Sequence, residues 1–488
     1  MASNDGIDEL KAKRLCYHCV GEQYLCDEVW RKGSRKQCSY CCRKARSYAL
    51  EDFADRVETA FEQHYRLTSD QPTSWELSLL SDRESDYNWE RHGEPVVWAI
   101  ANAAEIPEQA AQDIQNILDD KFSDFDSAMI GEETEFCAGS YYEEKGPNDY
   151  AWKEEWLYFE RLLKTEARFF SRSAAAHLES IFSGIDKMST AEGRPLLVNA
   201  GPQTMLTELF RARVFQSDEK LTEALSRPDR HLGSPPSALA LPGRMNAHGI
   251  SVFYGSDDLE VAIAEVRPPV GSQVAVARFE IVRPLRLLDL KALSSVTEYG
   301  SIFDPEWAAR LERAAFLRTL SLRITKPVMP NDEAFEYLPT QAIADFLATE
   351  NEPMVDGILF PSVQATGDGL NVVLFHKAAR VESMDIPVGT EIEALTGFIS
   401  EDGWEVDYSV NEQVPPKKLS NNENQEEESQ YLASFISDLT HDHDADLRDV
   451  TLRIDTETVS VHVVRGVKYN YDSHKVRRHR WEMGNVAF

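Results

Sequence analysis

The 488-residue sequence contains no uninterrupted apolar run that approaches the roughly 20 residues needed to span a bilayer. Basic residues are also scarce, because 51 lysines and arginines face 83 aspartates and glutamates, which gives a formal net charge of -32. General nucleic-acid binding needs a basic surface, so we do not expect nucleic acid as a partner. The polar, acidic start MASNDGIDEL resembles neither a signal nor a transit peptide. We therefore expect a cytoplasmic protein without a membrane partner.

Cysteine is scarce too, and six of the seven cysteines lie between residues 16 and 42. They include two Cys-x2-Cys pairs, and four thiolates from two such pairs satisfy the tetrahedral geometry of zinc. A disulfide framework is disfavoured in a cytoplasmic protein. The sequence therefore predicts a structural zinc ion bound by Cys16, Cys19, Cys38 and Cys41. The alternatives that stay open are Cys42 in place of Cys41, Cys26, and His18.

A chain of this length is expected to hold about three domains, and its 42% of hydrophobic residues is typical of a globular protein. Apolar residues recur at helical spacing in residues 50–61, 108–122 and 152–182, whereas strand and helix patterns mix from residue 196 onward. We therefore predict an α+β protein. The expected segments are a zinc knuckle over 1–48, a helical domain over 49–195, a domain with a central mixed β-sheet over 196–385, and a C-terminal extension over 386–488.

The C-terminal extension begins with little pattern and includes the acidic linker NNENQEEESQ at residues 421–430. Residues 447–464 then alternate between apolar and polar, as the two strands of a hairpin do, with residues 455–458 between the two runs. From these features we expect a small α/β extension.

Residues 243–267, GRMNAHGISVFYGSDDLEVAIAEVR, hold three side chains that are suited to one ligand. Arg244 lies in a turn and can grip a phosphate with its planar set of donors. Tyr254 ends an alternating strand pattern and can stack on a planar or cationic ring. Glu265 lies on a helical pattern and can accept a hydrogen bond from a sugar hydroxyl. Each residue taken singly is more typical of an ordinary surface or core position.

The order of Arg244, Tyr254 and Glu265 within GR-N-GI-VFY-A-AEVRP resembles the RES-domain family, whose fold is related to that of ADP-ribosyltransferase toxins. The segment Tyr337-Leu-Pro-Thr-Gln341 is also similar to the family, and Ser362 stands where the serine in the family's name stands. Characterised members degrade NAD or transfer ADP-ribose from it. The resemblance therefore implies a central domain of ADP-ribosyltransferase-like fold, with NAD as the substrate.

The resemblance also implies roles for single residues. Glu265 would stabilise the positive charge that develops on the ribose, and Ser362 would orient Glu265 or a ribose hydroxyl. The family carries an arginine in the first strand of the domain, for which we choose Arg211 over Arg213, although strand parity does not separate them. The implied catalytic residues are Glu265, Arg244, Tyr254 and Ser362, and the implied NAD-binding residues are Arg211, Arg244, Tyr254 and Asn371.

The predicted activity is cleavage of the nicotinamide–ribose bond of NAD with water as the acceptor, as in toxin-like or defence-related NAD depletion by bacteria. Transfer of ADP-ribose to a macromolecule is the alternative within the same fold. Short RES toxins come with a separate antitoxin, so the resemblance leaves room for a regulatory or inhibitory protein partner and for a homodimer.

The cysteine pairs and the helices after them resemble the HEPN/RES N-terminal domain of longer family members. HEPN ribonucleases carry an Arg-x4–6-His motif on a helix, and Arg172 with His177 fits this spacing. We prefer to interpret His177 as a packed or helix-surface histidine. A HEPN-type ribonuclease, or a zinc-dependent binding module with an inert RES fold, is the alternative from another class of function.

Overall fold

The structure is a computed structural model. It describes residues 4–82, 84–124, 133–362, 364, 369–401, 403–416, 446–468 and 471–480, so the acidic linker predicted at 421–430 lies outside the described residues. The chain divides into two compact units, which we describe separately: one comprises Met1–Leu196 and Ala292–Lys326, and the other Leu197–Lys291 and Pro327–Phe488.

The first unit is mainly helical and has only short strands. Its helices are α1 (Asn4–Ala12), α2 (Gln23–Lys32), α3 (Leu50–His64), α4 (Ser74–Ser81), α5 (Val96–Ala104), α6 (Glu108–Phe122), α8 (Tyr150–Thr165), α9 (Arg172–Phe182) and α14 (Trp307–Thr325), with 3-10 turns η1 (Tyr17–Cys19) and η2 (Ile185–Lys187). Its strands are β1 (Arg14–Cys16), β2 (Ser34–Gln37), β3 (Lys44–Ala49), β4 (Tyr65–Leu67), β5 (Glu94–Pro95), β6 (Tyr141–Glu144), β7 (Ser189–Thr190) and β13 (Val296–Thr297).

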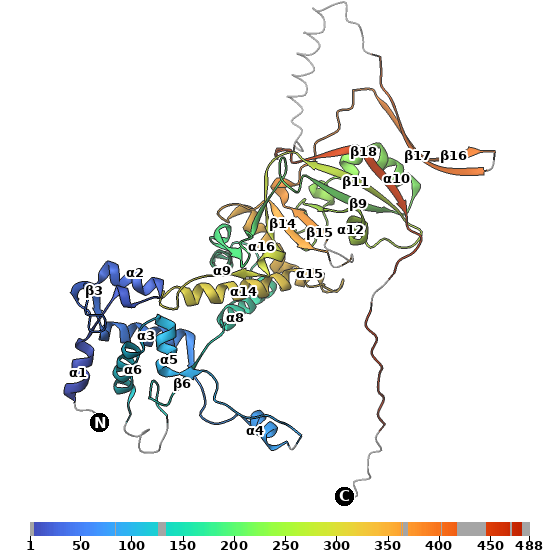
Figure 1. The fold of residues 1–488 in the computed structure, drawn as a ribbon. Coiled ribbons are helices and arrows are strands. Elements are labelled where there is room, and N and C mark those ends of the chain that lie inside the picture. Colours follow the sequence, from blue (N-terminus) through green and yellow to red (C-terminus); the bar gives the residue numbers. More distant parts are fainter. Residues whose placement is uncertain are drawn as a thin grey trace, which may run out of the picture. The chain divides into compact units, whose positions relative to one another are not determined.

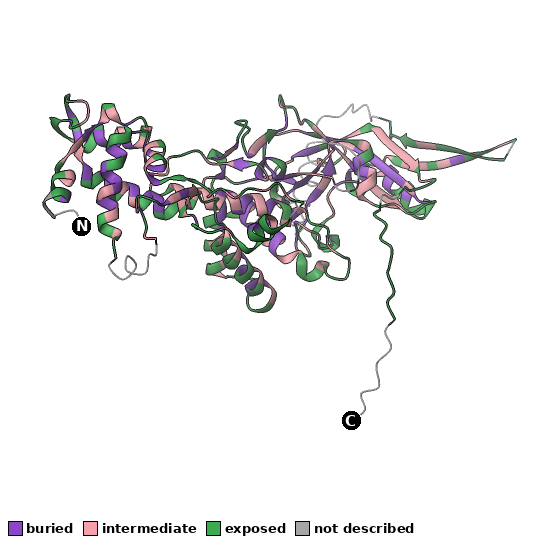
Figure 2. Cartoon of the chain, turned by 60° about the horizontal axis from the view of Figure 1, so that its bottom comes forward, coloured by how far each residue is buried: buried purple, intermediate pink, exposed green. Residues whose placement is uncertain are grey.

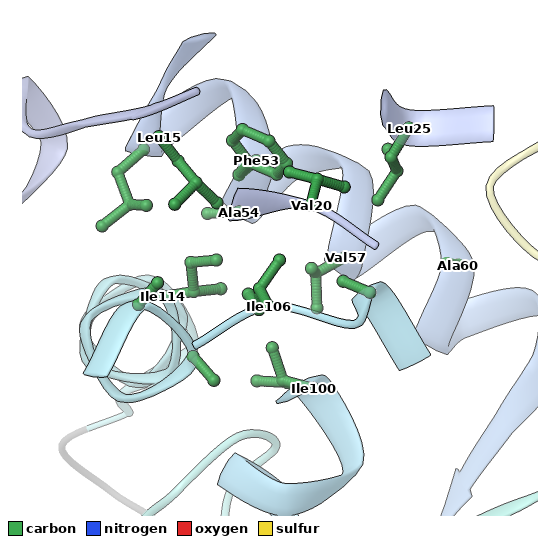
Figure 3. Close-up of a cluster of buried hydrophobic side chains, with 14 of the residues drawn as sticks. Leu15, Val20, Leu25, Phe53, Ala54, Val57, Ala60, Ile100, Ile106 and Ile114 are labelled. Atoms are coloured by element: carbon green, nitrogen blue, oxygen red, sulfur yellow. The ribbon is translucent and has the colours of Figure 1, made fainter. Parts of the chain in front are cut away.

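The core of the first unit forms around α3. Its residues Leu50, Phe53, Val57 and Phe61 follow one another at helical spacing and are all buried, which places them on one face of the helix. Figure 3 shows this face meeting apolar side chains from β1, α5, α6 and the loop between α5 and α6. Among the helices that the structure describes, none combines the length and the apolar character needed to cross a membrane.

The second unit is built around a β-sheet. Its strands are β8 (Leu197–Ala200), β9 (Glu208–Phe215), β10 (Phe253–Ser256), β11 (Gln273–Ile281), β12 (Leu285–Asp289), β14 (Gly357–Pro361), β15 (Leu370–Leu374), β16 (Glu391–Ser400), β17 (Gly403–Gln413) and β18 (Leu452–Val463). Its helices and turns are α10 (Asp218–Ser226), α11 (Pro228–His231), η3 (Ser237–Leu239), α12 (Leu259–Glu265), α15 (Glu333–Glu336), α16 (Leu338–Thr349) and η4 (His376–Ala378), and α13 (Leu290–Leu293) follows β12.

Eight of these strands form one mixed sheet in the order β18-β11-β9-β10-β15-β14-β12-β8 (Figure 1). All neighbours are antiparallel except β12 and β14, which run parallel. The expectation of an α+β protein with a large mixed sheet is therefore confirmed. The weakest junction is between β9 and β10, which are paired only at Phe210 and Ser256.

Both faces of this sheet are covered. Residues of β9, β10, β11, β12, β14 and β15 on one side form a core with Leu221 and Leu225 of α10. On the other side, Ala262 of α12 packs with Ala212, Val274 and Val276. Figure 2 shows the sheet strands largely buried and the ribbon of β16 and β17 largely exposed.

The two units differ from the expected segments at two places. Residues 292–326, which lie inside the expected sheet domain, cluster with the helical unit. Residues 452–463, expected in a separate extension, supply β18, an edge strand of the eight-stranded sheet.

The hairpin predicted for residues 447–464 is wrong, because this segment forms the single strand β18 along β11. The register shifts between Val276 and Arg278, whose partners are Ser460 and Asp455. Residues 456–459 lie between these partners and form a bulge within the strand. They overlap residues 455–458, which were interpreted as a hairpin turn. The described residues of 386–488 contain strands and no helix, so they do not show the α part of the expected α/β extension.

We expect Phe279→Ala to lower the free energy of unfolding by about 3–5 kcal/mol. The Phe279 side chain is fully buried, and its ring meets the Phe253 ring edge-on with 5.0 Å between centroids. Denaturant unfolding of the full chain measures the change. Phe398→Ala is the matched control because Phe398 is 49% exposed, and an equal effect of the two substitutions would contradict this account of the core.

Candidate functional site

Glu265 is placed by the short helix α12. Asp258 caps the helix, because its Oδ1 accepts hydrogen bonds from the backbone N–H groups of Glu260 (2.8 Å) and Val261 (3.1 Å). The apolar side of α12 packs on the sheet. Glu265 is the last residue of the helix, and its side chain is half-buried beside strands β14 and β15.

The Glu265 carboxylate is held by two donors from two different segments. Ser362, the first residue after β14, donates from Oγ to Glu265 Oε1 at 2.6 Å, and Asn371 of β15 donates from Nδ2 to the same oxygen at 2.7 Å. Ser256 Oγ in turn donates to Asn371 Oδ1 at 2.9 Å, which fixes the direction of the amide. Glu265 Oε2 accepts no hydrogen bond from the described residues, so one oxygen of an oriented carboxylate remains available to a ligand.

Tyr254 of β10 holds the loop that carries Arg244. Its Oη donates to Asn246 Oδ1 at 3.0 Å and accepts from the backbone N–H of Met245 at 3.1 Å. The Asn246 amide donates to the carbonyls of Leu241 and Ile250, at 2.9 and 3.0 Å, and so closes the loop. Burial raises the pKa of Tyr254 to about 12, so the hydroxyl stays protonated at neutral pH and can donate to Asn246.

The start of α16 supports the same loop from another direction. Thr340 Oγ1 donates to the Arg244 carbonyl at 2.5 Å, and Gln341 Nε2 donates to the Gly243 carbonyl at 2.8 Å. The Arg244 guanidinium lies over the Tyr337 ring, with 5.2 Å between Cζ and the ring centroid. The Tyr337–Gln341 segment, noted in the sequence for its family resemblance, therefore positions Arg244.

Arg211 of β9 is a buried arginine, 9% exposed, whose Cζ lies 4.7 Å from the centroid of the Phe253 ring. Its Nη1 is buried and has no hydrogen-bond partner in the described part of the chain. Burial, and then the charge of Arg213, lower the pKa of Arg211 to about 9. Both Arg244 and Arg211 lower the pKa of Tyr254 against the effect of burial, so each of the two guanidinium groups lies within electrostatic reach of Tyr254.

The structure thus brings the predicted residues together as two groups that share β10. Glu265, Ser362 and Asn371 form one hydrogen-bonded cluster, and Tyr254 holds the Arg244 loop. Arg211 belongs to neither group: it is paired with Ala277 and contacts Phe253, so its side chain leaves the sheet on the opposite face, where the α10 core lies. Tyr254 and Ser256, two residues apart on β10, point to the same face of the sheet. Sequence reasoning missed the positioning residues Ser256 and Asn246. Ser256 is signalled in the sequence only as a short polar side chain two residues after Tyr254, whereas Asn246 is the asparagine of the family-like segment GR-N-GI, whose role was not recognised.

The four cysteines of the two Cys-x2-Cys pairs converge at one point of the first unit. Their Sγ atoms lie within 4.8 Å of one another, with separations of 3.8 Å for Cys16–Cys19, 3.5 Å for Cys16–Cys41 and 3.9 Å for Cys19–Cys38. Four sulfurs at 2.3 Å from a tetrahedral zinc ion would be separated by about 3.8 Å. The donor set and its spacing therefore fit zinc.

The thiols of this cluster differ in how readily they ionise. Burial raises the pKa of Cys16 to about 11 and also raises that of Cys19. Burial opposes ionisation of Cys38 too, but backbone hydrogen bonds, chiefly from Cys41 and Tyr40, lower its pKa to about 7. The alternative ligands Cys26, Cys42 and His18 are not part of the cluster; Cys42 is exposed, and Cys26 Sγ lies 3.4 Å from the Tyr17 carbonyl oxygen.

His177 is packed among aromatic rings. Its ring centroid lies 5.5 Å from that of Phe159 and 6.2 Å from that of Trp156, and its Nδ1 lies 3.5 Å from a carboxylate oxygen of Glu155. Burial lowers the pKa of His177. Arg172 begins the same helix and is exposed.

Comparison with known proteins finds a family for part of the chain. Residues 208–396 match the family model of the RES domain, so this part of the chain belongs to the RES-domain family. The match starts at the first residue of β9, ends within β16, and includes every residue proposed for NAD. The cysteine cluster, β17 and β18 lie outside it. No curated protein matches the chain significantly.

We expect Gly243→Ala to disorganise the Arg244 loop and to lower the free energy of unfolding by about 1–3 kcal/mol. A Cβ at position 243 would lie 2.7 Å from both Asn246 Oδ1 and Tyr254 Oη, closer than these atoms can tolerate. Denaturant unfolding measures the loss. Gly466→Ala is the control, since a Cβ there would meet no atom within 4 Å; similar losses for both would show that the close approach at Gly243 is unimportant.

We expect the purified full-length protein to contain about one zinc ion per chain, and Cys38→Ser to contain almost none, because three thiolates bind zinc far more weakly than four. Elemental analysis of protein prepared under reducing conditions measures the content. Cys42→Ser should retain the metal, because Cys42 lies outside the cluster. Zinc retained by Cys38→Ser, or lost from Cys42→Ser, would be incompatible with this ligand set.

Proposed function

We propose that the RES domain of this protein is a NAD glycohydrolase. In the reaction, NAD and water give ADP-ribose, nicotinamide and a proton. The bond between nicotinamide nitrogen and ribose C1′ breaks with its electron pair leaving on nicotinamide, and a water oxygen forms the new bond to C1′. The family match points to a chemistry on NAD, and the geometry of Glu265 favours this particular reaction.

The observation that carries the proposal is that only one of the two Glu265 carboxylate oxygens accepts hydrogen bonds from the described residues. Ser362 and Asn371 both donate to Oε1, and Oε2 accepts nothing from the described residues. A carboxylate that is oriented before the substrate arrives can stabilise positive charge without the reorganisation that water would need. Such charge develops on the ribose when nicotinamide leaves, as it does on the sugar in glycoside hydrolysis.

The cationic groups near Tyr254 suit the rest of the substrate. Arg244 lies in a loop whose backbone forms hydrogen bonds with the side chains of Tyr254, Thr340 and Gln341. Arg211 presents a buried nitrogen that lacks a partner. Guanidinium groups bind phosphate oxygens with short, charge-assisted hydrogen bonds. In this proposal Arg244 and Arg211 bind the phosphates, and the Tyr254 ring contacts nicotinamide.

We further propose that the cysteine cluster holds zinc with a structural role. Four protein thiolates complete a tetrahedral shell and leave no position for water or substrate. The cluster lies where β1, η1 and the ends of β2 and β3 meet, so the metal would fix short strands that have few apolar residues of their own.

We expect Glu265→Gln to lower kcat for nicotinamide release by about 100- to 1,000-fold, because the amide keeps the shape of the side chain and removes its charge. Arg244→Ala should raise KM for NAD by about 10-fold or more through loss of a charge-assisted contact. Chromatography of nicotinamide and ADP-ribose measures both parameters.

Glu260→Gln is the matched control for Glu265→Gln, because Glu260 is an exposed residue of the same helix. His177→Ala should also leave NAD cleavage unchanged. Full activity of Glu265→Gln would rule out the proposed role of the carboxylate. Label from adenine-labelled NAD that stays on a macromolecule, instead of appearing as free ADP-ribose, would favour ADP-ribose transfer over hydrolysis.

A further inference from the structure

Strands β16 and β17 form a two-stranded ribbon whose outer half projects from the second unit (Figure 2). In this half, Ile399 pairs with Trp404, and Gly397 pairs with Val406. Paired residues of an antiparallel ribbon share a face, and residues two positions apart in a strand point to the same side. Ile399, Trp404 and Val406 therefore form one apolar face, which we call the ribbon face. They are 83%, 60% and 65% exposed, respectively, and exposed apolar side chains that gather on one face are typical of an interaction surface.

The Trp404 ring is held in place on the ribbon face. A Cβ at Gly397 would lie 2.7 and 2.8 Å from two ring atoms of Trp404, so the indole lies directly on the glycine backbone. An aromatic side chain that is already fixed loses little conformational entropy when it binds. Trp404 is therefore suited to anchor a partner on this face.

The inner half of the ribbon is anchored to the sheet, next to the start of the C-terminal tail, residues 465–480. Ala394 and Tyr408 pack on the core that α10 covers, and Gln273 Nε2 donates to Tyr408 Oη at 3.3 Å. In the sheet, Gln273 of β11 is paired with Val463, the last residue of β18. The tail therefore begins beside the base of the ribbon.

The ribbon and the tail carry opposite charges. Residues 391–413 contain seven aspartates and glutamates and no lysine or arginine, which gives a net charge of -7. The tail contains six lysines and arginines against one aspartate, a net charge of +5. Its described residues are all exposed and form no helix or strand. The chain thus presents an acidic ribbon and a basic extended segment that starts next to it.

We propose that the ribbon face is a dimerisation surface, and that its occupant is the C-terminal tail of a second copy of the chain. Within one chain the ribbon face is exposed, so the chain's own tail does not cover it. Two ribbons that met directly would repel each other, because each has a net charge of -7. A tail from each copy, laid along the ribbon of the other, reduces this charge to -2 per ribbon. The same contact then occurs twice, as in any two-fold dimer.

The tail has the length and the side chains that this contact needs. An extended chain advances about 3.3 Å per residue, so residues 465–480 can span about 50 Å, whereas the ribbon spans only about 17 Å from residue 403 to residue 408. The exposed apolar side chains of the tail include Val467 and Val476, which can contact the ribbon face. An arginine guanidinium of the tail can also lie on the Trp404 ring.

Analytical ultracentrifugation of the full-length protein tests the proposal. The parent protein should be a dimer at about 50 mM salt and should dissociate at about 0.5 M, because salt screens exposed charges. Arg477→Glu with Arg478→Glu should weaken dimerisation by about 10- to 100-fold, and so should Glu405→Lys with Asp407→Lys. Trp404→Ser should weaken it at both salt concentrations, because this substitution removes an apolar contact.

Mixing the two charge-reversed chains distinguishes a contact between copies from a contact within one chain. In the mixed dimer, one contact joins a reversed tail to a reversed ribbon, and the other is the parent contact. The mixture should therefore dimerise at least about 10-fold more tightly than either variant alone. The tail and the ribbon of each single chain stay mismatched in the mixture, so a contact within one chain would not be restored.

Two further charge reversals serve as controls. Arg35→Glu with Lys36→Glu matches the change in the tail, and Glu350→Lys with Glu352→Lys matches the change in the ribbon. These four residues are exposed and lie outside both segments, so both control variants should dimerise as the parent protein does. All of the reversed charges are exposed, and unfolding by denaturant should therefore be the same in every charge variant.

Three results would overturn the proposal. One is a parent protein that stays monomeric at about 100 μM and low salt, and another is a mixture that dimerises no more tightly than its two components. The third is a monomeric parent protein that binds a labelled single-stranded RNA and loses this binding in Arg477→Glu with Arg478→Glu, which would assign the tail to nucleic acid. None of these measurements involves NAD, so the proposed reaction of the RES domain is tested separately.

Discussion

The hydrogen bonds that Ser362 and Asn371 donate to one oxygen of Glu265 are the constraint on which the rest of the candidate site depends. The three residues come from the end of a helix, the residue after one strand and the second residue of another. Their side chains meet only if α12 packs on the sheet while β14 and β15 pair in their observed register, with Phe360 opposite Asn371. A slip of one residue would turn Asn371 to the other face of the sheet. The apolar contacts of α12 and the strand register therefore fix the orientation of the carboxylate.

Charge is distributed unevenly between the site and the chain as a whole. The sequence has a net charge of -32, yet two arginines, Arg211 and Arg244, lie within electrostatic reach of Tyr254. Among the described residues, no carboxylate forms an ion pair with the buried Arg211. Buried arginines in a strongly acidic protein would ordinarily find acidic partners. The lack of an ion pair at Arg211 among the described residues is consistent with the anionic ligand that we propose, since such a ligand would supply a negative charge.

The two units use different means to hold short segments together. In the sheet unit, extensive strand pairing and cores on both faces stabilise the fold. In the helical unit, the core around α3 covers one side of the small β1-β3-β2 sheet, and the four thiols gather next to it. The boundaries of the RES match differ from the boundaries of the two compact units. Residues 292–326 lie within the match but cluster with the helical unit, whereas β18 lies beyond the match but completes the sheet.

Local patterns in the sequence were sufficient to predict the α+β class, the apolar face of α3, and the two cysteine pairs. The order of Arg244, Tyr254 and Glu265 was also sufficient to indicate the RES family, because these features depend on residues within about 25 positions of one another. The same patterns gave the wrong fold for residues 447–464, since alternation is the same in a hairpin and in a bulged strand that pairs with a distant partner. They also could not decide between Arg211 and Arg213, or find Ser256 and Asn246. Those assignments depend on which strands become neighbours and on the register in which they pair. The burial of apolar faces fixes both, and it involves strands that are more than 100 residues apart in the chain.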